Sequence, residues 1–255
     1  MSRASLANAN ARMHAAKARL LTRAEAAPLF SATDDVAMQR VVAALGVADP
    51  MRSVLRIYQT AIRGYPRGEP LFRALLARHE IEDVKVSWRR SRHGGITPLQ
   101  IVEQLAATPY AAIAATVARA HGTDIAAAEL AFDRWVSQRL LDEARRLPRR
   151  EVLARRLVES VVRERDAELV RRGARWYGLT SVSGHADDVV TLRRERRRLC
   201  RRAFIGSPFL LAPAVAVILL AEEEMRAVQA LVERQGDASL DGPLLRALAA
   251  SQIGA

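Results

Sequence analysis

Apolar residues recur along the chain at helical spacing, and one pattern of charged and apolar positions occurs three times. Each copy has an acid, an apolar residue next to it, and a valine four positions after the acid. A basic or amide residue follows the valine, and two copies have an arginine nine positions after the acid. The copies contain Glu80, Val84, Lys85 and Arg89; Asp166, Val170, Arg171 and Arg175; and Glu224, Val228 and Gln229. This duplication predicts one supersecondary unit repeated three times.

The apolar positions of the first and third copies fall on one side of a helix. The two stripes are Ala77, Ile81, Val84 and Trp88, and Ala221, Met225, Val228 and Val232. We therefore expect Ile81, Val84, Trp88, Met225, Val228 and Val232 to be buried. Glu80 and Glu224 lie at the edges of these stripes, so each carboxylate is expected to have an arginine or a helix N-terminus as partner.

The remaining pattern is also helical. The predicted repeat helices span about residues 71–92, 150–177 and 214–235, and N-cap residues followed by proline at Thr97 and Thr108 predict two short helices between the first two. No segment shows strand alternation with β-branched enrichment. The sequence predicts an all-α fold, with residues 1–255 forming a single domain of three similar helical units.

The segment 203–221 is uncharged and has about the length of a membrane-spanning helix. Gly206, Pro208 and Pro213 interrupt its first half, which leaves residues 214–221 as the unbroken apolar part. A buried helix preceded by an extended linker is therefore a better interpretation than a transmembrane helix.

The composition indicates the charge of the protein and the compartment in which it works. The formal net charge is +12. Only Lys17 and Lys85 are lysines, so arginine carries nearly all of the basic charge, and part of this arginine content reflects a compositional bias. Cys200 is the only cysteine, which excludes an internal disulfide and indicates a reducing compartment. The first residues lack the apolar core of a signal peptide, and we expect a cytoplasmic protein.

Seven arginines lie close together in the predicted basic helix of residues 186–202. They are Arg193, Arg194, Arg196, Arg197, Arg198, Arg201 and Arg202. This cluster is a candidate contact for an acidic partner protein, for phospholipid head groups or for nucleic-acid phosphates, and equally it is compatible with a solvated helix face. No aromatic residues alternate with the arginines, as stacking on RNA bases would require.

Catalytic and metal chemistry are not indicated. Three acids in equivalent repeat positions fit a packing role better than a catalytic role, since acid chemistry needs groups that converge on one pocket. The histidines lack paired metal-ligand spacing, and His185 with Asp187 and Asp188 is explained more simply as an acidic helix start. We expect no catalytic residue, no metal and no cofactor.

Three segments give the chain a family resemblance. Residues 11–22 are similar to the opening helix of the C subunit of prokaryotic V/A-type ATPases, the counterpart of eukaryotic V-ATPase subunit d. Residues 78–89 match a signature of that family at Arg78, Glu80, Lys85 and Arg89, with Asp83 in place of asparagine. Residues 213–228 look like its C-terminal helix. The chain resembles a divergent, short member, in which Leu169 replaces the asparagine expected in the second repeat.

The resemblance implies three helical units arranged as a funnel with approximate three-fold internal pseudo-symmetry. It also implies a non-catalytic coupling subunit, which seats the central stalk on the proteolipid rotor ring and transmits torque for ion or proton transport. Such a subunit is peripheral on the cytoplasmic face of the membrane, and its partners are the other ATPase subunits. The alternatives are a basic helical protein that binds nucleic acid or regulates another protein, and a peripheral membrane protein without a rotary partner.

Overall fold

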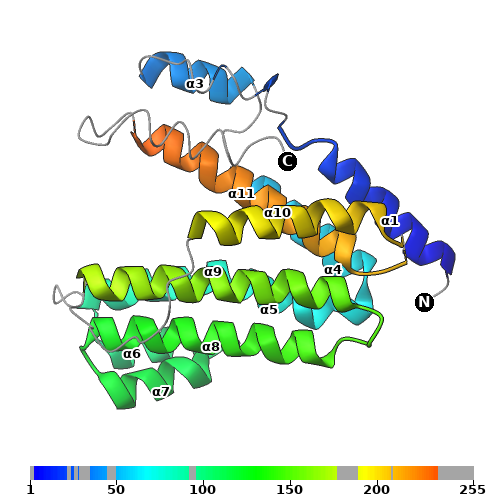
Figure 1. The fold of residues 1–255 in the computed structure, drawn as a ribbon. Helices are drawn as coiled ribbons and strands as arrows, with labels where there is room; N and C mark the ends of the chain where they lie inside the picture. Colours follow the sequence, from blue (N-terminus) through cyan, green and yellow to red (C-terminus); the bar gives the residue numbers. More distant parts are fainter. Residues whose placement is uncertain are drawn as a thin grey trace. The chain divides into compact units, whose positions relative to one another are not determined.

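A computed structural model of the chain shows a succession of helices (Figure 1). The structure describes residues 3–21, 24–25, 28, 35–44, 50–91, 96–176, 189–207 and 209–234. Within these ranges every regular element is helical and no strand occurs, which confirms the predicted all-α class.

The helices of the described ranges lie between residues 3 and 234. They are α1 (Arg3–Lys17), α3 (Asp35–Ala44), α4 (Pro50–Gly64), the short 3-10 helix η1 (Pro66–Gly68), α5 (Glu69–Ser91), α6 (Pro98–Gln104), α7 (Ala111–His121), α8 (Ile125–Arg146), α9 (Val152–Trp176), α10 (Val189–Ile205) and α11 (Ala212–Arg234). Helices α5, α9 and α11 match the three predicted repeat helices closely. Whether they are related by an internal rotation stays a prediction.

The described chain divides into two compact units. The first contains the residues before Pro70, Arg150–Leu157 and the residues from Arg196 onward, and the second contains Pro70–Arg149 and the residues from Val158 to Glu195. Helices α9 and α10 therefore each contribute residues to both units.

In the first unit, α1, α4 and α11 pack against one another (Figure 1). Every residue from Leu211 to Glu223 is buried, so the first half of α11 is surrounded on all sides. This confirms that the apolar run is a buried helix. The expected extended linker is shorter than predicted, since α10 continues to Ile205. No helix of the described ranges has the length and apolar character needed to cross a bilayer.

The contact between α1 and α4 is close at the end of α4. A Cβ atom added to Gly64 would lie 3.0 Å from Cβ of Ala9, so a larger residue would force the two helices apart. Next to this contact, the hydroxyl of Tyr65 donates a 2.7 Å hydrogen bond to Oδ1 of Asn10. Both side chains are buried, and the bond satisfies polar groups that would otherwise destabilise the core.

The second unit contains α5 to α8 and part of α9. Helix α7 packs against both α6 and α8, and α8 and α9 run side by side (Figure 1). The buried ring of Trp88 on α5 meets Phe132 on α8 edge to face, with ring centroids 5.3 Å apart. Its indole N–H donates to the carbonyl of Gly122, which ends α7 at a φ of 52° that favours glycine.

The two predicted N-caps, each a threonine followed by proline, differ in outcome: one marks the start of a helix and the other does not. Thr97 caps α6 as predicted, with its hydroxyl accepting from Gln100 N and the Gln100 side chain accepting from Thr97 N at 2.8 Å. Thr108 does not cap α7, which begins at Ala111. Its hydroxyl instead donates to the carbonyl of Leu105 at 2.7 Å, closing the turn that follows α6.

The predicted buried stripes are confirmed where the structure describes them. Ile81, Val84, Trp88, Met225 and Val228 are all buried. The side chain of Val232 lies outside the described part of the chain. The first and third repeat helices, α5 and α11, therefore turn these residues toward the cores of their units.

Candidate functional site

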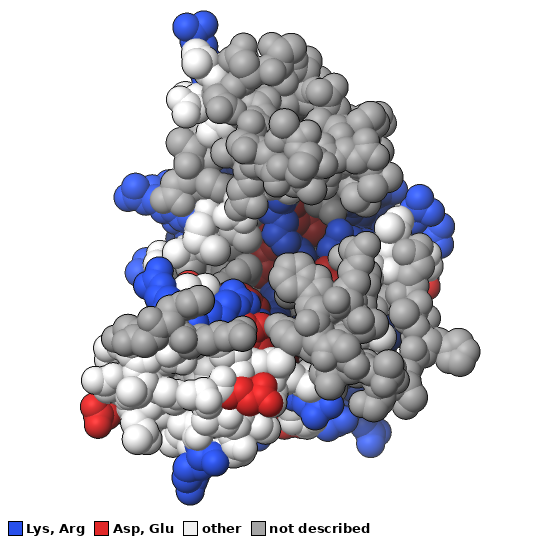
Figure 2. Space-filling model, turned by 90° about the vertical axis from the view of Figure 1, so that its left-hand side faces the viewer, with Lys and Arg blue, Asp and Glu red and all other residues white. Residues whose placement is uncertain are grey.

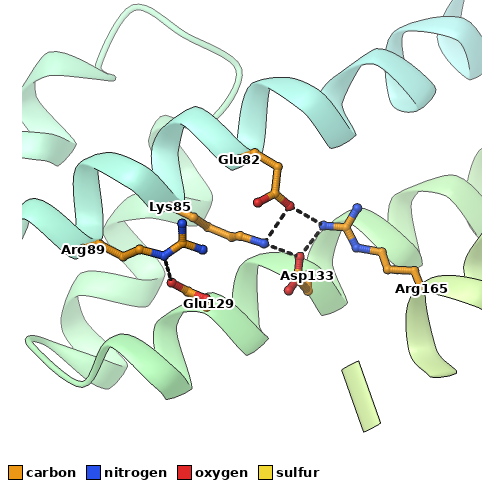
Figure 3. Close-up of polar contacts among 6 residues, drawn as sticks. All are labelled: Glu82, Lys85, Arg89, Glu129, Asp133 and Arg165. Carbon is orange, nitrogen blue, oxygen red and sulfur yellow. Dashed lines mark hydrogen bonds and ion pairs between the residues drawn. The ribbon is translucent and has the colours of Figure 1, made fainter. Parts of the chain in front are cut away.

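Two residues of the signature at 78–89, Lys85 and Arg89, take part in a network of charges inside the second unit (Figure 3). The ammonium of Lys85 on α5 lies 2.9 Å from Oδ1 of Asp133 on α8 and 2.7 Å from Oε1 of Glu82. The guanidinium of Arg165 on α9 approaches both carboxylates, pairing with Asp133 and lying 3.5 Å from Glu82. Two cations therefore meet two anions, and the group is electrically balanced.

Burial makes this network energetically important. The side chain of Lys85 is 1% exposed and that of Asp133 is 5% exposed, whereas Glu82 reaches solvent at 46%. An ammonium so deeply buried is strongly unfavourable unless oxygen atoms replace its hydration. Lys85 therefore ties α5 to α8, and Arg165 ties α8 to α9.

A second pair extends the network by one helical turn. Arg89 pairs with Glu129, and Figure 3 shows these two side chains beside Lys85 and Asp133. The bases lie four residues apart on α5 and the acids four residues apart on α8, in reverse order. This order requires α5 and α8 to run antiparallel, and it fixes the register in which they pack.

The partners of Lys85 and Arg89 were missed by the sequence analysis. Glu129 and Asp133 both lie on the apolar stripe of α8, next to Phe132 and Val136, where an acid has no reason to be unless a base faces it. Two acids at the spacing of the buried positions of α8 were the sequence signal that could have revealed these ion pairs. Arg165 gives no comparable signal, because it lies in a helix with many arginines.

The acids of the three repeats have different surroundings. Glu80 is exposed and accepts a hydrogen bond from the hydroxyl of Tyr110. The expected arginine or helix N-terminus is therefore wrong for Glu80. Burial and the Glu80 carboxylate raise the pKa of Tyr110. Asp166 is exposed as a residue, yet burial of its carboxyl raises its pKa more than the charge of Arg165 lowers it.

The third acid, Glu224, lines a cavity of about 450 Å³ between α1, α4 and α11. Its Oε2 accepts a 2.7 Å hydrogen bond from the backbone N–H of Leu21. Burial raises the pKa of Glu224 to about 7, the hydrogen bond opposes this rise, and Glu25 adds to it. Among the described residues, the partner of Glu224 is therefore a backbone N–H just beyond α1 and not the expected arginine.

The other repeat positions are less constrained. Val170 and Gln229 are half-buried, and the side chains of Arg171 and Arg175 lie outside the described residues. The repeat pattern therefore marks helix faces correctly. Among its described basic positions, Lys85 lies in the buried network, and Arg89 pairs with Glu129 at the exposed edge of that network.

The arginine cluster of α10 is divided by the structure. Arg196 is 2% exposed and binds Glu223 on α11 through Nε at 2.9 Å, and Arg197 binds the other oxygen of Glu223 at 2.9 Å. Burial raises the pKa of Glu223, but the charges of Arg196 and Arg197 outweigh burial and hold the pKa below its usual value. Arg193 binds Glu164 at 2.6 Å and Glu168 at 2.7 Å on α9.

Three members of this candidate contact surface, Arg193, Arg196 and Arg197, are therefore paired with carboxylates of α9 and α11. Arg193 holds the first part of α10 on α9, and Arg196 and Arg197 hold its second part on α11. The remaining members, Arg194, Arg198, Arg201 and Arg202, are exposed. On the face drawn in Figure 2, basic side chains occupy several separate places with acidic ones among them.

Within the described ranges, no group of three or more histidine, cysteine, aspartate or glutamate side chains is arranged to hold a metal ion. His185, Asp187 and Asp188 lie outside these ranges. The single thiol, Cys200, is buried, and burial together with Glu223 raises its pKa to about 12. A thiol in this state is a poor nucleophile.

Comparison with known proteins gives no relative. The chain matches no family model, no curated protein and no solved structure. Function must therefore be inferred from the residues and their geometry.

Proposed function

We propose that the protein is a non-catalytic coupling subunit of a rotary V/A-type ATPase. In this role it seats the central stalk on the proteolipid rotor ring at the cytoplasmic face of the membrane and transmits torque for ion transport. The observation that carries the proposal is the position of the signature residues. Lys85 and Arg89, which match the family motif, are used to hold α5 on α8.

A signature lysine that forms a buried ion pair fits a mechanical role. Breaking a buried pair leaves an unpaired charge in the core, so helices joined in this way resist sliding past each other. The Lys85 and Arg89 pairs give α5 and α8 one register. A subunit that transmits torque needs such rigidity between its helices.

The other two segments of the resemblance support the same proposal. Residues 11–22 include the end of α1, residues 213–228 lie in α11, and these two helices pack against each other in the first unit. A funnel of three similar units with three-fold pseudo-symmetry is part of the proposal. The partners are then the central-stalk and ring subunits, and the protein works without a cofactor.

The division of the arginine cluster favours this proposal over nucleic-acid binding. Arg193, Arg196 and Arg197 are bound to carboxylates of neighbouring helices, so they are not available for phosphates. Nucleic-acid affinity rises with each phosphate contact, and the loss of three contacts lowers it steeply.

The proposal is tested by measuring whether ATP hydrolysis stays coupled to ion transport. In membrane vesicles from cells that lack the protein, ATP hydrolysis by the nucleotide-binding subunits should continue while ATP-driven ion transport is lost. Re-expression of the wild-type chain should restore transport, and so should a control with Arg145→Gln, which removes only an exposed pair with Asp142. Transport that stays coupled to hydrolysis without the protein would refute the proposal.

A further inference from the structure

The last two turns of α10 carry a basic face that no other part of the described chain covers. Arg198, Arg201 and Arg202 are all exposed, and their spacing of three and four residues places them on one side of the helix. Among the described residues, no carboxylate lies within ion-pair distance of these three side chains. Glu223 of α11 instead accepts hydrogen bonds from Arg196 and Arg197, on the inner side of α10.

Apolar side chains continue this face at its end. Ile205 is three residues beyond Arg202 and is 86% exposed, and Phe209 in the following turn is 42% exposed. Large apolar side chains this exposed in adjacent turns are unfavourable in water and indicate a surface that another phase or molecule covers.

A further cation lies beside this face. The ammonium of Lys17 on α1 is 4.1 Å from the centre of the Phe204 ring, and His14 meets the same ring edge to face. Lys17 therefore adds a positive charge at the last turn of α10, which also carries Arg202. All of these residues belong to the first unit, so the surface does not depend on the second.

We infer that the end of α10 docks on an anionic phospholipid surface. Arg198, Arg201 and Arg202 bind the head-group phosphates, and Ile205 and Phe209 enter the interfacial layer beneath them. A membrane offers both features in one place, since its acyl chains begin directly below the charged head groups. A nucleic acid offers phosphates but no apolar phase for an aliphatic side chain such as Ile205.

The size of the effect follows from the number of charges. One arginine near an anionic surface strengthens binding about fivefold, which corresponds to about 1 kcal/mol, so three arginines account for about 100-fold. An isoleucine that enters the interface adds about tenfold. The surface is independent of the coupling role, because a membrane contact of this kind needs no ATPase subunit.

The experiment is flotation of the purified full chain with vesicles of phosphatidylcholine, with and without phosphatidylserine. The wild type should bind the anionic vesicles and not the neutral ones. The variant Arg198→Gln/Arg201→Gln/Arg202→Gln should bind the anionic vesicles about 100-fold more weakly, and Ile205→Ser about tenfold more weakly. Circular dichroism confirms that each variant is folded.

The matched control is Arg145→Gln/Arg146→Gln/Arg150→Gln, which removes the same charge from exposed arginines elsewhere. It should keep nearly all of the vesicle binding. Equal losses in the two triple variants would show only a net-charge effect and would overturn the inference. An Ile205→Ser variant that binds like the wild type also overturns it, as does binding to RNA without binding to vesicles.

Discussion

Replacing Lys85 with methionine removes one charge from the centre of the buried network and keeps most of the side-chain volume. Asp133 is then left with Arg165 as its remaining cation, and Glu82 is close to solvent. Breaking a buried pair by removing one partner costs about 3–5 kcal/mol. Because Arg165 still balances Asp133, we expect the lower end of this range, about 3 kcal/mol.

The opposite change is expected to cost more. Asp133→Leu leaves two buried or half-buried cations, Lys85 and Arg165, which share only Glu82. In the double variant Lys85→Met/Asp133→Leu the remaining pair, Arg165 and Glu82, is partly solvated. Its cost should therefore be at least about 2 kcal/mol less than the sum of the single costs.

Urea unfolding followed by tryptophan fluorescence measures these costs, since Trp88 and Trp135 lie in α5 and α8. The control is Arg145→Met, which breaks an exposed pair and should cost under about 0.5 kcal/mol. A Lys85→Met cost below about 1 kcal/mol, or single costs that simply add, would refute the buried network.

Three other features lead to direct tests. The raised pKa of Glu224, about 7 against 4.5 when unfolded, contributes stability that is complete below about pH 4.5 and is lost as pH rises through about 7. Glu224→Gln should therefore remove up to roughly 3 kcal/mol of pH dependence from urea unfolding, and profiles that run parallel to the wild type contradict this. Cys200 should react with an aromatic disulfide reagent only after unfolding, because burial raises its pKa to about 12, and rapid labelling of the native protein contradicts its placement. Tyr110→Phe removes the hydrogen bond to the exposed Glu80 and should cost about 1 kcal/mol in the same assay, so a cost of about 3 kcal/mol means that the carboxylate is buried.

Helix positions and buried faces were predictable because they depend on short-range spacing. Ile81, Val84 and Trp88 repeat at the period of one helix, and any core that accepts the helix must face that side. The buried helix at Ala214 was predictable for the same reason, since prolines and a glycine limited its length.

Ion-pair partners were not predictable from local spacing. From its neighbours in the sequence, Lys85 would be taken for a solvated lysine. Its partner Asp133 lies 48 residues away on α8, and only the packing of α5 on α8 brings the two together. The arginines of α10 form one cluster in the sequence, but the structure separates Arg196 from Arg198 because α11 presents Glu223 to only one side. Which charges become internal depends on which helices meet, and that is a property of the tertiary fold.

The proposal of a rotary coupling subunit is tested most directly by purification of the tagged chain from native membranes in mild detergent, with the co-purified proteins identified by mass spectrometry. Central-stalk and proteolipid-ring subunits should co-purify with the wild type, and also with Arg198→Gln/Arg201→Gln/Arg202→Gln, because the membrane contact is independent of the coupling role. Recovery of RNA or DNA with a steep salt dependence, and of no ATPase subunit, would contradict the proposal and favour the nucleic-acid alternative.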